Sequence, residues 1–208
     1  VSTIAHDVAR MHEKSDIALS ETSYRRLKKC PRVFPKVSYD EAIEMLAEMG
    51  ESIGWGDDIS SQQEKMLVEK FGNHPLFITR YPDSHWDHGK PIEVEKFFNM
   101  LPDTVNPGRV LSADLILPDG GEAVGSAARV HIAETMVSRL KNSRMFKRLI
   151  GMGGSLDDFQ WYIDTLEKQG SVPHAGCGFG MARIAQWVLG TNDIRQAVVF
   201  PSNRATLI

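Results

Sequence analysis

Two acidic residues flank a predicted tight turn, and together they could hold a metal ion. Asp114 precedes the turn at Gly120–Gly121, and Glu122 follows it directly. Facing side chains on antiparallel strands have Cβ atoms about 4.5–5.5 Å apart, and Mg²⁺ is usually held by one or two carboxylates plus phosphate oxygens. Spacing alone favours the simpler alternative of two solvated acids, because Asp and Gly are common beside turns.

A glycine series further along the chain could receive a flat or negatively charged ligand. Gly176, Gly178 and Gly180 remove side chains from alternate positions of a predicted strand, which lets a ring or a phosphate approach the backbone closely. The helix that follows offers unpaired amides, and Arg183 adds a planar cation in its first turn. Glycine patterns alone are weak evidence, so a turn kept for packing is an equal alternative.

A single arginine could read a ligand in the same pocket. Arg129 lies seven residues beyond Glu122 on the same predicted strand, and a guanidinium can bind a carboxylate or an amide oxygen. Taken alone, Arg129 fits a salt bridge at the rim better than a ligand contact. His174 is more typical of a packed histidine than of a base, and the basic stretch 139–148 of a solvated helix face than of an RNA contact.

The elements that must position these residues follow from hydrophobic spacing and from turn residues. Short segments rich in β-branched and aromatic residues are bounded by Pro, Asp and Gly, and blocks of helical periodicity lie between them. The expected strands span 75–81, 96–101, 109–117, 122–127, 171–179 and 197–200, and the expected helices span 38–49, 60–71, 130–149, 155–170 and 181–189. Without strict strand–helix alternation, this order predicts an α+β fold around an antiparallel sheet flanked by helices.

Bulk composition narrows the class of protein. The chain has 24 Lys and Arg against 27 Asp and Glu, a net charge of −3, so no global attraction to nucleic acid or to an acidic membrane is expected. Two distant cysteines favour a reducing, cytoplasmic setting over a disulfide scaffold. No apolar run reaches the ~18–20 residues of a membrane span. Because the chain opens on Val1 in mid-pattern, we expect it to be N-terminally incomplete.

Taken together, these segments resemble a known family. The run 171–190, with Asn192–Arg195 and Phe200–Pro201 after it, is similar to the third signature motif of class II aminoacyl-tRNA synthetases. Within that class the run looks closest to the asparaginyl and aspartyl enzymes, and segments 34–39, 41–44, 55–58, 75–82, 113–115 and 121–122 resemble the asparaginyl type. The resemblance runs from about residue 31 to 204. It divides the chain into a helical lead-in, 1–30, and the C-terminal part of a catalytic core, 31–208, with the third motif at 173–190.

The resemblance implies a ligase of protein biosynthesis that binds ATP, Mg²⁺ and aspartate or asparagine. The amino acid's carboxylate attacks the α-phosphate, giving an aminoacyl-adenylate that is transferred to tRNA. The resemblance implies that Asp114 and Glu122 hold Mg²⁺ and that Arg129 and Ser126 contact the amino acid. It implies that Arg183 binds ATP over a floor made by Gly176, Gly178 and Gly180. The catalytic roles fall to Glu122 and Arg183. No residue need act as a nucleophile, because positioning and charge stabilisation suffice.

Several positions depart from the family pattern. Alanines stand at 127, 128 and 182 where polar or acidic residues are usual, and Ser202 stands where an arginine is usual, with Arg204 following later. The first motif, which makes the homodimer interface, and the second, whose arginine grips the α-phosphate, have no counterpart here. The chain alone is therefore expected to form adenylate poorly. Two rivals stay open: an asparagine synthetase that transfers aspartyl-adenylate to ammonia, and a non-catalytic paralogue that binds an amino acid or a partner.

Overall fold

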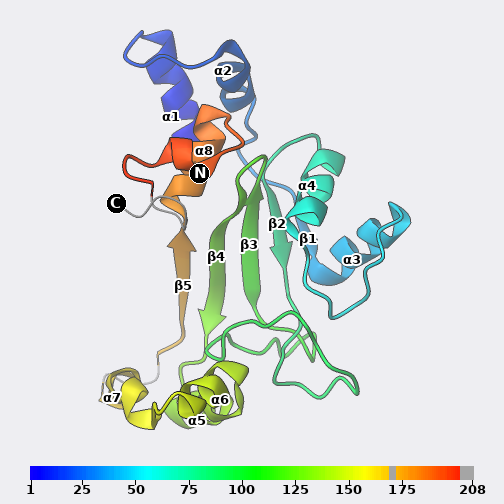
Figure 1. The fold of residues 1–208 in the computed structure, drawn as a ribbon, viewed down its shortest axis with the longest axis vertical. Coiled ribbons are helices and arrows are strands. Elements are labelled where there is room, and N and C mark those ends of the chain that lie inside the picture. The colour runs from blue at the N-terminus through cyan, green and yellow to red at the C-terminus, as the bar shows by residue number, and fades with distance from the viewer. Residues whose placement is uncertain (169–171, 202–208) are drawn as a thin grey trace.

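A single mixed sheet organises residues 1–168 and 172–201, which the computed structural model describes. Its five strands lie in the order in which they occur along the chain, so that neighbours in sequence are neighbours in the sheet (Figure 1). The first pair is parallel and the other three pairs are antiparallel. The strands are β1 (Lys36–Ser38), β2 (Leu76–Thr79), β3 (Ser112–Leu117), β4 (Gly121–Arg129) and β5 (His174–Phe179). The expected α+β class is confirmed.

Helices cover the two ends and one side of this sheet (Figure 1). One end carries α1 (Ser2–Glu13), α2 (Glu21–Lys28) and α8 (Met181–Leu189), and the side next to β1 and β2 carries α3 (Tyr39–Glu48) and α4 (Ser61–Lys70). The other end carries α5 (Ala133–Asn142), α6 (Arg144–Gly151) and α7 (Gln160–Lys168), and two short 3₁₀ helices span Leu156–Phe159 and Ile194–Ala197. Each group buries its own apolar cluster against the sheet or its loops.

Local capping explains where the predicted helices begin and end. The hydroxyl of Ser38 accepts a hydrogen bond from the backbone N–H of Glu41, and the Glu41 carboxylate accepts one from the Ser38 N–H. Ser60 and Gln63 form the same kind of capping box at α4. Such reciprocal bonds satisfy amides that a helix N-terminus leaves unpaired. At its C-terminus, helix α8 ends at Gly190, whose left-handed backbone, with φ of +72°, suits glycine. The expected helices at 38–49, 60–71 and 181–189 are confirmed to within two residues.

The register of β3 and β4 decides which side chains share a face. Asp114 pairs with Gly125 and Ile116 pairs with Glu122, with a bulge between the two pairs. Because directly paired residues project to the same side of a sheet, Asp114 and Glu122 lie on one face despite the extra residue. We call this the acid face. The strand positions on it are Ser112, Asp114, Ile116, Glu122, Gly125, Ala127 and Arg129.

Two expected strands are absent from the described part of the chain. Segment 96–101 forms one isolated bridge, between Met100 and Arg129, because a turn from Phe97 to Met100 interrupts any longer pairing. Residues 198–200 follow a 3₁₀ helix and lie away from the sheet, with Val199 and Phe200 largely exposed. In contrast, the three residues of β1 were too few to predict from pattern.

The expected helix at 130–149 is two helices. Ser143 has an extended backbone, with ψ of 149°, and it ends α5 while capping α6. Its hydroxyl donates to the carbonyl of Leu140 and accepts from the N–H of Phe146, so it satisfies one group of each helix. The expected helix at 155–170 begins instead with a 3₁₀ turn and continues as α7.

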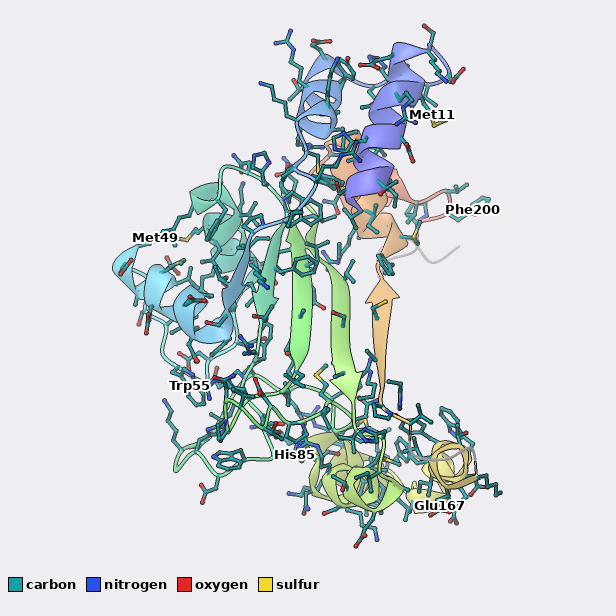
Figure 2. All side chains as sticks on the ribbon, turned by 180° about the vertical axis from the view of Figure 1, so that it is seen from behind. Met11, Met49, Trp55, His85, Glu167 and Phe200 are labelled. Atoms are coloured by element: carbon teal, nitrogen blue, oxygen red, sulfur yellow. The ribbon has the colours of Figure 1, made fainter. Side chains whose placement is uncertain are left out.

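The long connection from β2 to β3 crosses the lower end of the sheet, where His85 and Trp55 are seen from behind (Figure 2). It is fixed by Asp83, which is 3% exposed and receives both terminal nitrogens of Arg139, at 2.9 and 3.0 Å. Burial alone would raise the pKa of Asp83, but hydrogen bonds from His85 and Arg139 hold it well below its usual range. The loop is therefore anchored to α5, and it delivers residues 94–100 to the acid face.

Candidate active site

Bare backbone forms the floor of the acid face. Gly125 pairs with Gly178, and Ala127 pairs with Gly176, so three glycines and one small residue occupy adjoining positions on β4 and β5. A Cβ added to Gly178 would meet no atom within 4 Å, which means that the space above it is open. A flat ligand can therefore lie directly on the strands here.

The two predicted acids meet at one end of this floor. If Gly125 carried a Cβ, that atom would lie 3.0 Å from Glu122 Oε1 and 3.7 Å from Asp114 Oδ1. Asp114 is 2% exposed, whereas Glu122 is open to solvent. Partial burial and the neighbouring Asp114 charge raise the pKa of Glu122. The two oxygens converge on a space that fits one hard cation, and a side chain at 125 would fill that space.

Arg183 reaches the same end of the floor from the first turn of α8. Its Nη1 donates to the carbonyl of Gly120 at 2.8 Å, and it would lie 3.2 Å from a Cβ on Gly121. The same helix fixes the turn a second time, since Gln186 donates to the carbonyl of Asp119. The guanidinium is thus held beside the turn that carries Glu122.

Sequence reasoning missed a third carboxylate at this position. Glu64 projects from α4, and its Oε2 would lie 3.4 Å from a Cβ on Gly121, next to Arg183. Burial and the charge of Glu122 raise the pKa of Glu64 to about 7, although Arg183 opposes the change. A helical position with polar neighbours in sequence gave no signal of this burial.

Sequence reasoning also missed a lysine that pairs with the buried acid. Lys96 Nζ lies 2.5 Å from Asp114 Oδ2 and 3.6 Å from the ring centroid of Tyr81. The Tyr81 side chain is itself buried, and burial together with Asp114 raises its pKa well above the usual value. Lys96 was expected to belong to a strand, but it lies in an irregular part of the loop between β2 and β3.

Arg129 lies at the opposite end of the floor. Its Nη1 donates to Asn99 Oδ1 at 2.7 Å, while its Nε and Nη2 would lie 3.2 and 3.3 Å from a Cβ on Gly176. The guanidinium therefore extends over the glycine strip, and Asn99 steadies one nitrogen and leaves the other edge facing the floor. Asn99 is a further residue that spacing did not single out.

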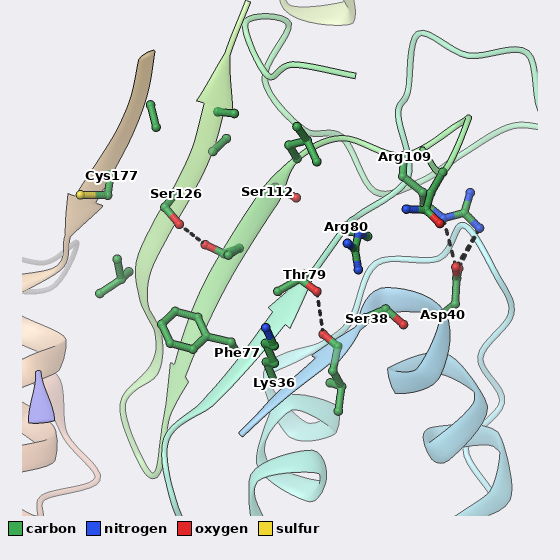
Figure 3. A pocket seen from close by; sticks show the side chains of 18 of the residues that line it. Lys36, Ser38, Asp40, Phe77, Thr79, Arg80, Arg109, Ser112, Ser126 and Cys177 are labelled. Atoms are coloured by element: carbon green, nitrogen blue, oxygen red, sulfur yellow. Dashed lines mark hydrogen bonds and ion pairs between the residues drawn. The ribbon is translucent and has the colours of Figure 1, made fainter. Parts of the chain in front are cut away.

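Gly180 and Ser126 take different positions from the rest. The Gly180 N–H donates to the carbonyl of Ala123 at 2.8 Å, which fixes the junction of β5 and α8 at the end of the floor. Ser126 pairs with Ala113 and Cys177 on the opposite face, and its hydroxyl donates to the Ala113 carbonyl at 2.6 Å (Figure 3). The structure does not bring Ser126 together with Arg129.

A broad groove of about 1070 Å³ lies on that opposite face (Figure 3). Phe77, Thr79 and Ser126 line it, and its far wall is the ion pair between Asp40 and Arg109, which lie 2.9 Å apart. In the groove, Asp40 and Arg109 already pair with each other. We therefore place the candidate site on the acid face, where burial and like charges raise the pKa values of two carboxyl groups.

Two other kinds of site find no support in residues 1–168 and 172–201. Among these residues, no group of three or more His, Cys, Asp or Glu side chains is arranged to hold a metal ion. No described helix is long and apolar enough to cross a membrane. Ser202 and Arg204, which depart from the family pattern, lie outside the described residues.

Comparison with known proteins identifies the family. The family described as "tRNA synthetases class II (D, K and N)" matches residues 1–204. The chain belongs to this family. It is 37% identical to the asparagine–tRNA ligase of Pyrococcus abyssi over 195 residues, and 34% identical to that of Thermococcus kodakarensis over all 208. These alignments cover 93% and 100% of the chain, but only 40% and 43% of the relatives.

Solved class II synthetases share the fold. The asparaginyl-tRNA synthetase from Pyrococcus horikoshii, complexed with asparaginyl-adenylate, aligns with the whole chain and 43% of its own length, with a TM-score of 0.76 and 31% identity. The aspartyl-tRNA synthetase from Entamoeba histolytica aligns with 96% of the chain and 38% of its own length, with a TM-score of 0.70 and 27% identity. The resemblance of the sequence to the asparaginyl and aspartyl enzymes is confirmed.

Proposed function

We propose that this class II synthetase chain contributes the adenylate-forming site of an asparagine-specific ligase. The observation that carries the proposal is the glycine floor, with Arg129 at one end and Asp114, Glu122 and Arg183 at the other. The Arg129 end suits an amino acid, and the other end suits a nucleoside triphosphate. Asparagine is favoured over aspartate because the curated relatives at 34–37% identity are asparagine–tRNA ligases.

At the nucleotide end, we propose that Arg183 binds ATP phosphate. Gly176, Gly178 and Gly180 form the floor against which the bound ligand lies, and Gly176 extends this floor to the Arg129 end. Asp114 Oδ1 and Glu122 Oε1 face the space over Gly125, and these residues would hold Mg²⁺. When bound, the metal would neutralise charge on the phosphates. The protein groups bind and orient the reactants, and such positioning can supply several kcal/mol of catalysis, about 7–11 in favourable cases.

At the amino-acid end, we propose that Arg129 donates to the side-chain oxygen of the substrate. Its free edge faces Gly176, and Asn99 holds its remaining nitrogen. A planar guanidinium fixed in this way offers directional donors to a carboxamide or a carboxylate oxygen. The proposed role of Ser126 in amino-acid binding requires a change of position, because its hydroxyl now bonds to Ala113 on the other face.

The partners of the complete reaction follow from the same proposal. Relatives with the printed name asparagine–tRNA ligase support tRNA as the acceptor, and ammonia stays an alternative acceptor for the same adenylate. A homodimer in the cytoplasm is proposed on family grounds.

A non-catalytic binding role is a second candidate, favoured by two observations. Lys96 occupies one oxygen of Asp114, and alanines stand at 127 and 182 where the family pattern has polar groups. A protein that binds the amino acid without activating it would tolerate both features. Ligand binding without any adenylate formation would support this candidate.

Thermal unfolding in the presence of single ligands tests the proposal. A ligand at 100 times its Kd stabilises a protein by about 2.7 kcal/mol, so asparagine should raise the Tm by several degrees. Lysine, the substrate of another member of the matched family, serves as the control, and aspartate tests specificity. Equal responses to all three amino acids, or none to ATP and asparagine, would contradict the proposed function.

A further inference from the structure

The ammonium of Lys96 lies where a cation would neutralise the buried acid of the candidate site. We propose that Lys96 is a resident cation: it holds one oxygen of Asp114 and weakens the binding of a free divalent ion by Asp114 and Glu122. The proposal rests on the metal role proposed for that pair. It concerns what this chain's own lysine does to the pair.

The geometry of the contact supports a built-in pair. Lys96 Nζ is 2.5 Å from Asp114 Oδ2, with the two side chains 16% and 3% exposed. The ammonium also lies 3.6 Å from the ring centroid of Tyr81, and the negative face of an aromatic ring attracts a cation. Surface lysines gain little from one ion pair, but this one is enclosed by an acid and a ring together.

The segment that carries Lys96 is tied to the fold on both sides. Val94 is 3% exposed and its N–H donates to the carbonyl of Gly56, whereas the carbonyl of Phe98 accepts from Arg139. Lys96 lies between these two anchors, so its backbone is fixed and its side chain has a short range of movement. The pairing with Asp114 is therefore positioned by the loop.

The charges of the site explain the expected effect. Asp114 and Glu122 together offer a divalent ion two negative charges, and Lys96 cancels one of them while occupying Oδ2. Asp114 Oδ1 and Glu122 Oε1 stay directed at the space over Gly125. A metal can use these oxygens, but it meets an ammonium on the far side of the same carboxylate. Metal binding is then favoured chiefly together with the phosphates of a nucleotide, which add the missing negative charge.

Titration of the protein with Mn²⁺ alone, followed by electron paramagnetic resonance of the free ion, tests the proposal. Lys96→Gln removes the charge but keeps a donor for Asp114, and we expect it to bind Mn²⁺ at least about tenfold more tightly than the parent, from the loss of one nearby positive charge. Lys96→Arg keeps the charge and should resemble the parent. Lys90→Met is the matched control, because Lys90 lies in the same loop and over the ring of Trp55, and its ammonium donates to the Trp55 carbonyl.

Each outcome decides the matter. If Lys96→Gln binds Mn²⁺ no more tightly than the parent, Lys96 is not a resident cation. If this variant is unfolded without metal, Mn²⁺ must restore a folded state that shows a cooperative unfolding transition. Failure to do so contradicts the proposal equally. Adding Glu122→Gln to Lys96→Gln should abolish the gain. Mn²⁺ binding that appears with ATP in the parent, without any effect of Lys96→Gln, would leave the proposed metal pair intact and overturn only the role of Lys96.

Discussion

Two buried aspartates in this protein receive very different partners. Asp83 is 3% exposed and both of its oxygens accept from Arg139, with a further bond from the N–H of His85. Asp114 is 2% exposed and its Oδ2 pairs with Lys96, but its Oδ1 faces Glu122 across a glycine. A fully satisfied carboxylate holds a loop in place. A carboxylate with one oxygen directed at a like charge retains the capacity to bind.

The largest expected effect is on Asp83. Removing one partner of a buried ion pair leaves the other charge uncompensated, which costs about 3–5 kcal/mol. We therefore expect Asp83→Ala to lower the free energy of unfolding by that amount in urea denaturation. Asp164→Ala is the control, because it breaks an exposed pair with Lys168, and such pairs contribute little to stability. Similar losses in the two variants would contradict a structural role for Asp83.

The next effect is a pH dependence that originates in Glu64. Its pKa rises from 4.5 to about 7 on folding, so the folded state binds the proton more tightly than the unfolded state does. The resulting stability is fully present below pH 4.5 and is lost as the pH rises through 7. We expect the parent to lose about 1–2 kcal/mol between pH 5 and pH 8 relative to Glu64→Gln, after allowance for solvent screening.

Urea midpoints measured across that pH range provide the comparison. Glu69→Gln, an exposed substitution on the same helix, should follow the parent at every pH. A constant difference between the parent and Glu64→Gln from pH 5 to pH 8 would show that Glu64 does not titrate in this range.

The smallest stability effect is expected at Asp114 itself. Asp114→Asn deprives Lys96 of its partner, but it also removes the repulsion that Asp114 exerts on Glu122 and Glu64. These changes oppose each other, and we expect a net loss smaller than that of Asp83→Ala, measured by the same denaturation. An equally large loss would mean that Asp114 has a structural role like that of Asp83.

The sequence predicted the parts of this site that depend on strand alternation and turn chemistry. Asp114 and Glu122 around a glycine turn were placed on adjoining strands, and β3 and β4 have that register on one face. Gly176 and Gly178 were expected to bare one face of a strand, and they do so next to Gly125. These features repeat with a period of two along a strand, which the sequence displays directly.

The parts that the sequence did not predict depend on long-range packing. Glu64 comes from a helix and Lys96 from an irregular loop, and neither position has a local pattern that reveals its neighbours. The position of Ser126 on the opposite face follows from strand alternation, because Ser126 is the neighbour of Gly125, which lies on the acid face. The resemblance to a family motif predicted instead that Ser126 contacts the amino acid. The break at Ser143 has a local sequence feature, because a serine can cap a helix by accepting from the N–H three residues later, here that of Phe146. Helical periodicity on both sides of Ser143 favoured one continuous helix instead.

The central claim is that the glycine floor has an amino-acid end and a nucleotide end. Calorimetry on the parent, Arg129→Ala and Arg183→Ala, with asparagine and ATP titrated separately, tests it most directly. A ligand group that loses its charged partner in a buried site costs about 2–3 kcal/mol, so Arg129→Ala should weaken asparagine by that amount and leave ATP nearly unchanged. Arg183→Ala should do the reverse. Equal weakening of both ligands by both substitutions would contradict the account.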